Sequence, residues 1–225
     1  MDTNREKLIE NCVRCPRLIE HCKKIAIEKK KMYQDWTYWG RPVPDFGPRS
    51  ARLLIVGLAP AAHGANRTGR MFTGDNSGLW LYRALHRAGF ANQFSFERST
   101  DGLQLFDACI TAVCHCAPPD NKPTPTEIQN CRPYLVDALD SMKNVEVYLA
   151  LGGLAWNALF RELEERGELT KPKPKFSHGC KVQLKSKGWL VGSYHPSQQN
   201  TFTGRLTEKA FDDVFATCRT LLQKT

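Results

Sequence analysis

The sequence lacks several patterns that would assign it to large classes of protein. It contains no G-x-G-x-x-G fingerprint and no P-loop, which counts against a nucleotide-binding α/β enzyme. Its longest apolar runs, Leu53–Leu58 and Val147–Leu151, are far too short to span a bilayer. We find no internal repeat and no low-complexity tract. The opening residues are polar and carry no apolar signal-peptide region, so we expect a cytoplasmic protein with no membrane partner.

What is present is a basic chain of ordinary globular composition. The 225 residues suit a single α/β domain, and the net charge of +9 favours a polyanionic partner. A basic solvated surface would also explain the charge. Two lysine clusters nevertheless favour phosphate neutralisation and a nucleoid-associated protein: Lys23, Lys24, Lys29, Lys30 and Lys31, and then Lys171, Lys173, Lys175, Lys181, Lys185 and Lys187.

Strand and helix patterns alternate along the chain. Apolar runs predict buried strands at Leu53–Leu58, Cys109–Val113, Val145–Leu151 and, after a Lys-rich hairpin-like stretch, Trp189–Tyr194. Helical patterns cover Gly78–Ala88, Thr126–Leu139 with Thr126 as N-cap, Leu154–Leu163 and Leu206–Leu222. The alternation indicates an α/β fold with a parallel sheet covered on both faces. The segment Thr37–Arg49 is expected to be an irregular arm leading into the first strand, and Lys171–Lys175 a surface loop.

Ligands of such sheets bind at the carboxyl ends of the strands. The segments that follow the strands are therefore the ones to search for a site: Gly57–Asp75, Cys116–Lys122, Gly152–Gly153 and His195–Asn200.

The nine cysteines include a possible metal-binding set. In an intracellular chain, cysteines are more often ligands or buried fillers than disulfides. Cys12 and Cys15 form a C-x2-C pair, and Cys116 and Cys131 bracket one Pro-rich loop, with Cys114 as the nearest rival to Cys116. Four thiolates hold either zinc or an iron–sulfur cluster, and the spacing does not decide between them. Unpaired core thiols are the alternative.

Two longer motifs resemble a known family. The segments GLAPAAHG at 57–64 with GRMFTGD at 69–75, and SYHPSQQN at 193–200, look like the two signature motifs of the uracil-DNA glycosylase superfamily. With the four cysteines, the chain resembles the B-type (family 5) members of thermophilic prokaryotes, from Cys12 to about Leu206.

The resemblance implies a fold and a cofactor. The fold is a three-layer α/β/α sandwich around a four-stranded parallel sheet, in one domain over residues 1–225. It implies a [4Fe–4S] cluster on Cys12, Cys15, Cys116 and Cys131, with zinc as the lesser alternative. We expect the cluster to tie down an N-terminal arm of residues 1–50, and the protein to be a monomer.

The resemblance also implies the chemistry of a DNA-repair hydrolase that cuts the N-glycosidic bond of a flipped base. Phe72 is the candidate wall that stacks on the base, and Asn121 the candidate reader of its edge, because an amide both donates and accepts. A core aromatic and a turn asparagine are the plain alternatives. His195 is expected to donate a hydrogen bond to the base oxygen on which negative charge grows.

The first motif departs from the best-known branch of the superfamily. That branch has an Asp at the position of Ala59 and a bulky aromatic at the position of Ala61. Asp75 is the nearest acid and is predicted to replace the missing one, although it is also a candidate helix N-cap. The alanines Ala59, Ala61 and Ala62 predict a wide pocket that takes uracil and hypoxanthine, unless they only allow close backbone packing.

The loop after His195 is expected to enter the minor groove of the DNA. Gln199 and Phe202 are both candidate wedges for the gap left by the flipped nucleotide, in double- or single-stranded DNA. Arg205 and the Lys-rich segment are candidate phosphate contacts. Two other functions stay open: a narrower A-type iron–sulfur uracil-DNA glycosylase, and a non-catalytic, metal-stabilised nucleic-acid-binding module.

Overall fold

The sheet is mixed, with four parallel strands and one antiparallel edge strand. The computed structural model describes residues 3–169, 172 and 174–223. The strands lie in the order β2-β1-β3-β5-β4, with bounds β1 Leu53–Gly57, β2 Ala108–Ala112, β3 Val147–Leu151, β4 Lys181–Gln183 and β5 Trp189–Ser193. All pairs are parallel except β4 with β5. The expected four-stranded parallel sheet is confirmed, and the Lys-rich hairpin adds β4 at its edge.

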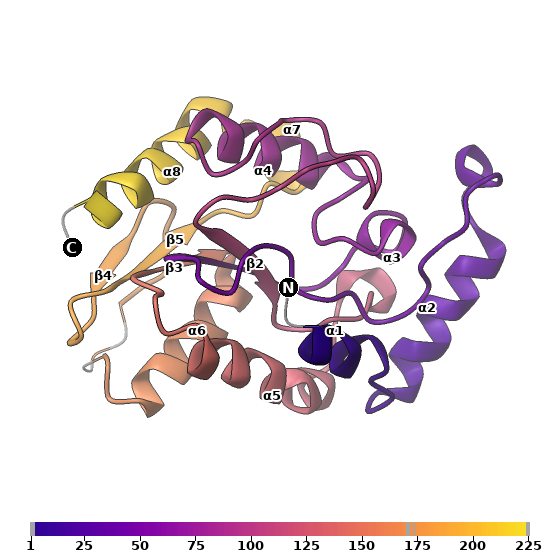
Figure 1. The fold of residues 1–225 in the computed structure, drawn as a ribbon, viewed down its shortest axis with the longest axis horizontal. Helices are drawn as coiled ribbons and strands as arrows, with labels where there is room; N and C mark the ends of the chain where they lie inside the picture. Colours follow the sequence, from indigo (N-terminus) through magenta and orange to yellow (C-terminus); the bar gives the residue numbers. More distant parts are fainter. Residues whose placement is uncertain (1–2, 170–171, 173, 224–225) are drawn as a thin grey trace.

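Helices cover both faces of the sheet, which confirms the expected three layers (Figure 1). On one face lie α4 (Asn76–Arg87) and α8 (Glu208–Gln223), packed on a core that includes Ile55, Leu149 and Val191. On the other face lie α5 (Pro125–Ser141) and α6 (Gly153–Glu165), packed on Leu54, Val56 and Ala150. Alternate residues of the same strand thus fill opposite cores, as the pleat of a strand requires.

One helix start differs from the expectation. The N-cap of α5 is Thr124 rather than Thr126. The Thr124 hydroxyl accepts from the Glu127 amide at 3.2 Å, and the Glu127 carboxylate accepts from the Thr124 amide at 2.7 Å. This reciprocal capping box satisfies two amides at the helix start, and Pro125 fits the first helical position because its missing N–H is not needed there.

The N-terminal arm is helical before it becomes irregular. It contains α1 (Thr3–Glu10), α2 (Pro16–Glu28) and the 3-10 turn η1 (Lys31–Tyr33), whereas the stretch from 37 to 49 is irregular as expected. Arg5 is buried and anchors α1 by donating to Asp45 at 2.9 Å and to the Tyr134 carbonyl at 2.7 Å. The arm is therefore packed on the domain by side chains of its own.

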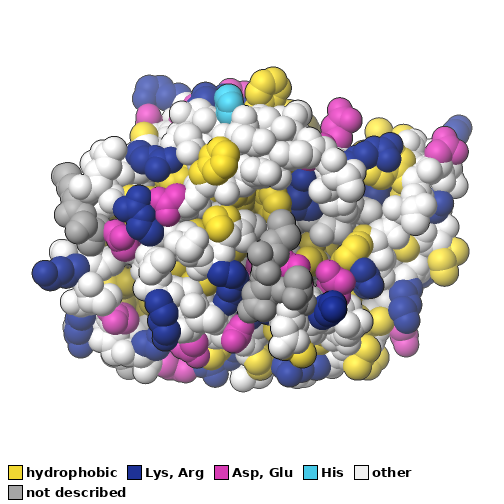
Figure 2. All heavy atoms as spheres, viewed as in Figure 1, with side chains coloured by type: hydrophobic (Ala, Val, Ile, Leu, Met, Phe, Trp, Pro, Cys, Tyr) yellow, Lys and Arg dark blue, Asp and Glu magenta, His cyan; other side chains and the backbone are white. Residues whose placement is uncertain are grey.

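Short helical segments complete the connections: α3 (Ala65–Thr68), the 3-10 turn η2 (Pro119–Asn121) and α7 (Gln198–Phe202). No helix in the described ranges is long and apolar enough to cross a membrane. On the face that Figure 2 shows, basic and acidic side chains are intermingled, so this face carries no broad patch of one sign.

Candidate active site

A large cleft opens at the carboxyl ends of the parallel strands. Its volume is about 690 Å³, which lies within the range of about 300–1,000 Å³ that is usual for ligand pockets. The walls come from the segments after β1, β3 and β5 together with the start of α4 and the turn η2. The cleft is therefore where the strand order predicts a ligand site.

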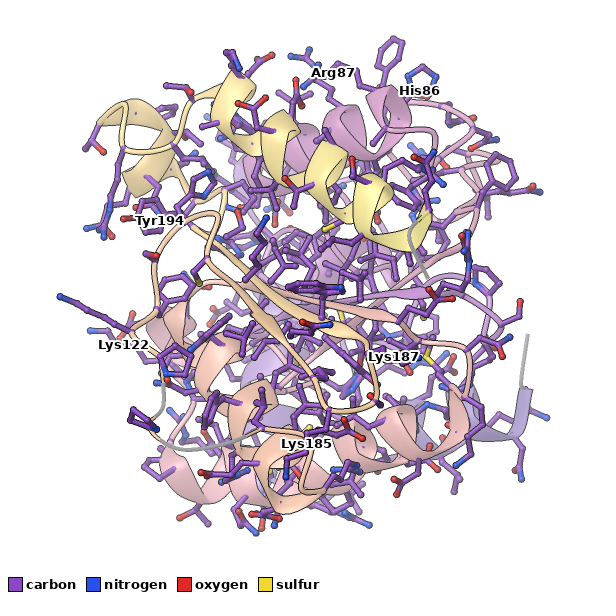
Figure 3. All side chains as sticks on the ribbon, turned by 90° about the vertical axis from the view of Figure 1, so that its left-hand side faces the viewer. His86, Arg87, Lys122, Lys185, Lys187 and Tyr194 are labelled. Carbon is purple, nitrogen blue, oxygen red and sulfur yellow. The ribbon has the colours of Figure 1, made fainter. Side chains whose placement is uncertain are left out.

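Most of the candidate pocket residues line this one cleft. They are Ala59, Ala61, Phe72, Asp75, Asn121, His195 and Gln199. Ala62 faces away from it and packs on the cluster of Leu18, Cys22, Cys116 and Ala117. Phe202 ends α7 with 77 % of its surface exposed, and Arg205 stacks on Tyr194 at 4.4 Å. Tyr194 and Lys122 lie toward the same side of the molecule (Figure 3).

Phe72 is presented in a strained conformation. Its φ of 54° lies in the left-handed region, which a bulky residue rarely adopts. The chain permits it because Gly78 has no Cβ, which would lie 1.7 Å from the Phe72 carbonyl oxygen. The ring lies over Gly57 and 5.8 Å from the His195 ring, centroid to centroid. Strain of this kind persists where the surrounding structure over-determines it.

The loop that carries Phe72 is held by buried polar side chains. Thr68 donates to the Thr73 carbonyl at 3.2 Å, and Arg70 donates to the Thr73 hydroxyl at 2.8 Å. Arg70 in turn forms a two-pronged pair with Asp101 at 2.7 Å. These bonds fix the loop on a rigid base, so the Phe72 ring is a preformed wall of the cleft.

His195 follows β5 and borders the cleft as a neutral imidazole. Burial lowers the pKa of His195 to about 4, because the charged form loses its hydration. Its carbonyl accepts from the Asn200 side chain at 2.8 Å. Within the described part of the chain, no hydrogen bond occupies either ring nitrogen, so an N–H of this ring is available to a ligand in the cleft.

Asp75 is both the N-cap of α4 and a wall of the cleft. Its carboxylate accepts from the Gly78 amide at 3.0 Å. Burial raises the pKa of Asp75, and the amides of Gly78 and Ser77 and the charge of Arg67 oppose that rise. The two roles predicted for Asp75, helix cap and catalytic acid, are therefore compatible, because one carboxylate oxygen caps the helix while the residue also lines the cleft.

Two further residues of the cleft lining have strained backbone conformations. Asp120 and Asn121 in η2 have φ values of 53° and 56°, a region that Asn and Asp tolerate better than other residues. Leu154 was not predicted as a site residue, yet it lines the cleft from the first turn of α6 with 54 % of its surface exposed. The Gly152–Gly153 pair before it was the available signal.

The four candidate cysteine ligands line one small cavity at the base of the arm, together with His115, Asn130 and Tyr134. The Asn130 side-chain amide lies 3.6 Å from the Cys15 sulfur, and the His115 backbone amide donates to the Cys131 sulfur at 3.3 Å. Among the described residues, no three ligands are close enough to hold one metal ion. The four cysteines therefore share one cavity without forming a single-ion site among the described residues.

The lysine clusters are dispersed. Lys175 is exposed beside Phe176, which packs near Gly153 and Tyr194 at the cleft end of the sheet. Lys185 and Lys187 lie in the turn before β5, at the opposite end of that strand from His195, and Figure 3 shows them away from Tyr194 and Lys122. In the arm, Lys24 pairs with Glu28 and Lys29 bonds the Gln34 carbonyl. Lys171 and Lys173 lie outside the described residues.

Comparisons with known proteins point to one superfamily. The profile of the Uracil DNA glycosylase superfamily matches residues 44–219. The chain is 48% identical over 215 residues to the type-5 uracil-DNA glycosylase of Mycobacterium tuberculosis, which covers 95% of this chain and 79% of that protein. It is 41% identical over 221 residues to the type-5 enzyme of Thermus thermophilus, covering 97% and 98%.

A type-4 relative is less similar. The type-4 uracil-DNA glycosylase of Pyrobaculum aerophilum is 31% identical over 184 residues, covering 80% of each chain. The superfamily match spans most of the chain, and the type-5 relatives are more similar over a longer stretch than the type-4 relative. The chain belongs to the uracil-DNA glycosylase superfamily, in its type-5 branch.

Proposed function

We propose that this protein excises uracil from DNA by hydrolysing the N-glycosidic bond, leaving an abasic site for base-excision repair in the cytoplasm. The observation that carries the proposal is the convergence of Phe72, Asp75 and His195 on one cleft. The flipped base stacks on the Phe72 ring, and Asn121 at the rim reads its edge. The superfamily membership and the type-5 relatives support the same activity.

The reaction separates charge along the bond that breaks. The base leaves with the bonding electrons, and the His195 N–H hydrogen-bonds the oxygen on which the negative charge accumulates. The sugar becomes cationic, and the Asp75 carboxylate stabilises it and orients the water that attacks the sugar carbon. A neutral His195 suits this task, since it donates a hydrogen bond without first being protonated.

The cleft also supports a broad choice of base. Ala59 and Ala61 contribute only methyl groups to its wall, and the volume of about 690 Å³ leaves room for a purine. We therefore propose hypoxanthine as a second substrate. Ala62 takes no part in this argument, because it packs against the arm.

The activity is tested on DNA duplexes that carry one uracil or one hypoxanthine, followed by alkaline cleavage of abasic sites. We expect strand scission at both bases and none at an undamaged base. Absence of scission with both substrates, by protein that binds the duplexes, would leave the chain as a binding module. Scission at uracil alone would remove the breadth proposal only.

The cysteine cavity supports a [4Fe–4S] cluster on Cys12, Cys15, Cys116 and Cys131. When bound, the cluster would supply structural cross-linking of the arm, with no redox step in hydrolysis. Anaerobically purified protein is expected to be brown, with about four iron and four sulfide per chain. Cys131→Ala should lose iron, whereas Cys218→Ala, a buried thiol of α8 far along the chain, should retain it. A colourless protein with stoichiometric zinc would contradict this proposal.

The dispersal of the lysines predicts which of them contact DNA. Lys175, at the cleft end of the sheet, should contact a phosphate, so Lys175→Ala should lower the slope of log affinity against log salt by about one. Lys185→Ala removes the same charge at the far end and should leave the slope unchanged. Fluorescence anisotropy with a labelled abasic duplex at several salt concentrations measures both. Equal slopes for the two variants would refute this assignment.

A further inference from the structure

A buried arginine lies behind the catalytic loop. Arg67, in α3, exposes 4 % of its surface, although arginine is almost never buried without a partner. In the described part of the chain, no carboxylate lies within ion-pair distance of it, and its Nη1 atom is buried without a hydrogen-bond acceptor. A guanidinium held in this way is costly to bury, so its surroundings should explain what it does.

Aromatic rings of the N-terminal arm enclose the guanidinium. The Arg67 Cζ atom lies 3.8 Å from the centroid of Tyr33 and 4.1 Å from that of Trp36. Cation–π contacts of this kind offset part of the lost hydration. Because Tyr33 and Trp36 come from the arm, the orientation of Arg67 depends on the arm being in place.

The guanidinium donates two hydrogen bonds to backbone next to the cleft. Its Nε donates to the His63 carbonyl at 2.8 Å, and its Nη2 donates to the Gly74 carbonyl at 2.9 Å. Gly74 has a φ of 89°, and a Cβ there would lie 2.4 Å from Nη2, so only glycine allows this close approach. Arg67 therefore holds the peptide group between Gly74 and Asp75 in place by a hydrogen bond.

Arg67 also acts on the charge of Asp75. Burial raises the pKa of Asp75 above its usual range, and Arg67 is the charged group that opposes the rise among the described residues. The positive charge thus favours the carboxylate form, which is the form that stabilises a cationic sugar.

We propose that Arg67 is a positioning residue for Asp75. Stacked on the rings of Tyr33 and Trp36, its guanidinium fixes the Gly74–Asp75 peptide group and places a positive charge near the carboxylate. The proposal rests on the role given to Asp75 above. The N-terminal arm then contributes to catalysis indirectly, because it supplies both rings on which Arg67 stacks.

The test is a set of Arg67 variants assayed by single-turnover uracil release against pH. In Arg67→Met the rate at neutral pH should fall about tenfold or more. Its acid limb should move to higher pH, because the carboxyl loses the charge that favours ionisation. Arg67→Lys keeps the charge and should keep the limb near its wild-type position. Arg41→Met is the matched control, because Arg41 also stacks on a ring of the arm, Trp39 at 3.8 Å, but pairs with Glu10 rather than with the Gly74 carbonyl.

A double-mutant cycle separates positioning from general damage to the fold. In an Asp75→Asn background, Arg67→Met should slow the reaction less than twofold further, because coupled residues are not additive. Additive losses, or an acid limb that does not move, would overturn the proposal. If the wild-type protein released no uracil at all, the proposed function would fail first, which is a distinct outcome.

Discussion

Replacing His195 with alanine is expected to slow uracil release about 10²–10³-fold, because one preorganised donor to a developing anion contributes about 3–4 kcal/mol. Binding to uncleavable DNA should change little, since the ring acts on the departing base rather than on the backbone. Single-turnover kinetics and anisotropy measure the two effects separately. His86→Ala is a matched control, because His86 is exposed on α4, outside the lining of the cleft.

The same residue predicts the shape of the pH profile. Since burial lowers the pKa of His195 to about 4, its imidazole stays neutral at every pH above about 5. His195 should therefore contribute no inflection near pH 6.5, the usual value for histidine, to the wild-type profile. A rate that falls as pH rises through 6.5, in a step that His195→Ala abolishes, would show that the imidazolium is the active form, contrary to our mechanism.

Asp75→Asn should lower the rate about 10²–10⁴-fold, the range for loss of a positioned acid–base group. The amide still accepts the Gly78 hydrogen bond, so the cap of α4 is kept. In the wild type, the raised pKa of Asp75 makes the rate fall as pH decreases through that value, because the protonated carboxyl no longer stabilises a cation.

The stability of this variant should move in the opposite direction. When folding raises the pKa of a carboxyl group, the folded state favours the protonated form. The contribution of that group to the stability of the fold is then highest at low pH and decreases as pH rises through the folded-state pKa. Ionisation of Asp75 is therefore a cost to the fold, and Asp75→Asn should melt at or above the wild-type temperature at neutral pH. A clearly lower Tm, measured by circular dichroism, would mean that the rate loss reflects damage to the loop.

The strands and the cleft could be predicted from the sequence because their signals are local. Apolar β-branched runs placed all four parallel strands within two residues, and the rule for parallel sheets then placed His195 and Asp75 at one edge. The orientation of Ala62 could not be predicted, because an irregular loop has no periodicity that tells which side chains face the ligand. Its neighbours Ala59 and Ala61 line the cleft, whereas Ala62 turns toward α2.

Other features depend on contacts between distant segments. The division of the lysines between two ends of the sheet follows from the hairpin of β4 and β5 and cannot be seen in a count of charges. Arg67 lies within the stretch from Gly57 to Asp75, yet its partners Tyr33 and Trp36 are about thirty residues away. A burial pattern for arginine has no sequence signature, so only the packed structure draws attention to it.

The two sheet edges have a consequence for how copies of the protein behave at high concentration. An exposed edge strand is a template on which another chain can add and begin to aggregate. At one edge β4 is only three residues long, Lys181–Gln183, and begins with a lysine. At the other, Phe46 bridges to Ile110 in β2 and occupies part of its free side. Both edges of the sheet are therefore poor templates for a strand of another chain, which should keep concentrated protein dispersed and hinder fibril growth.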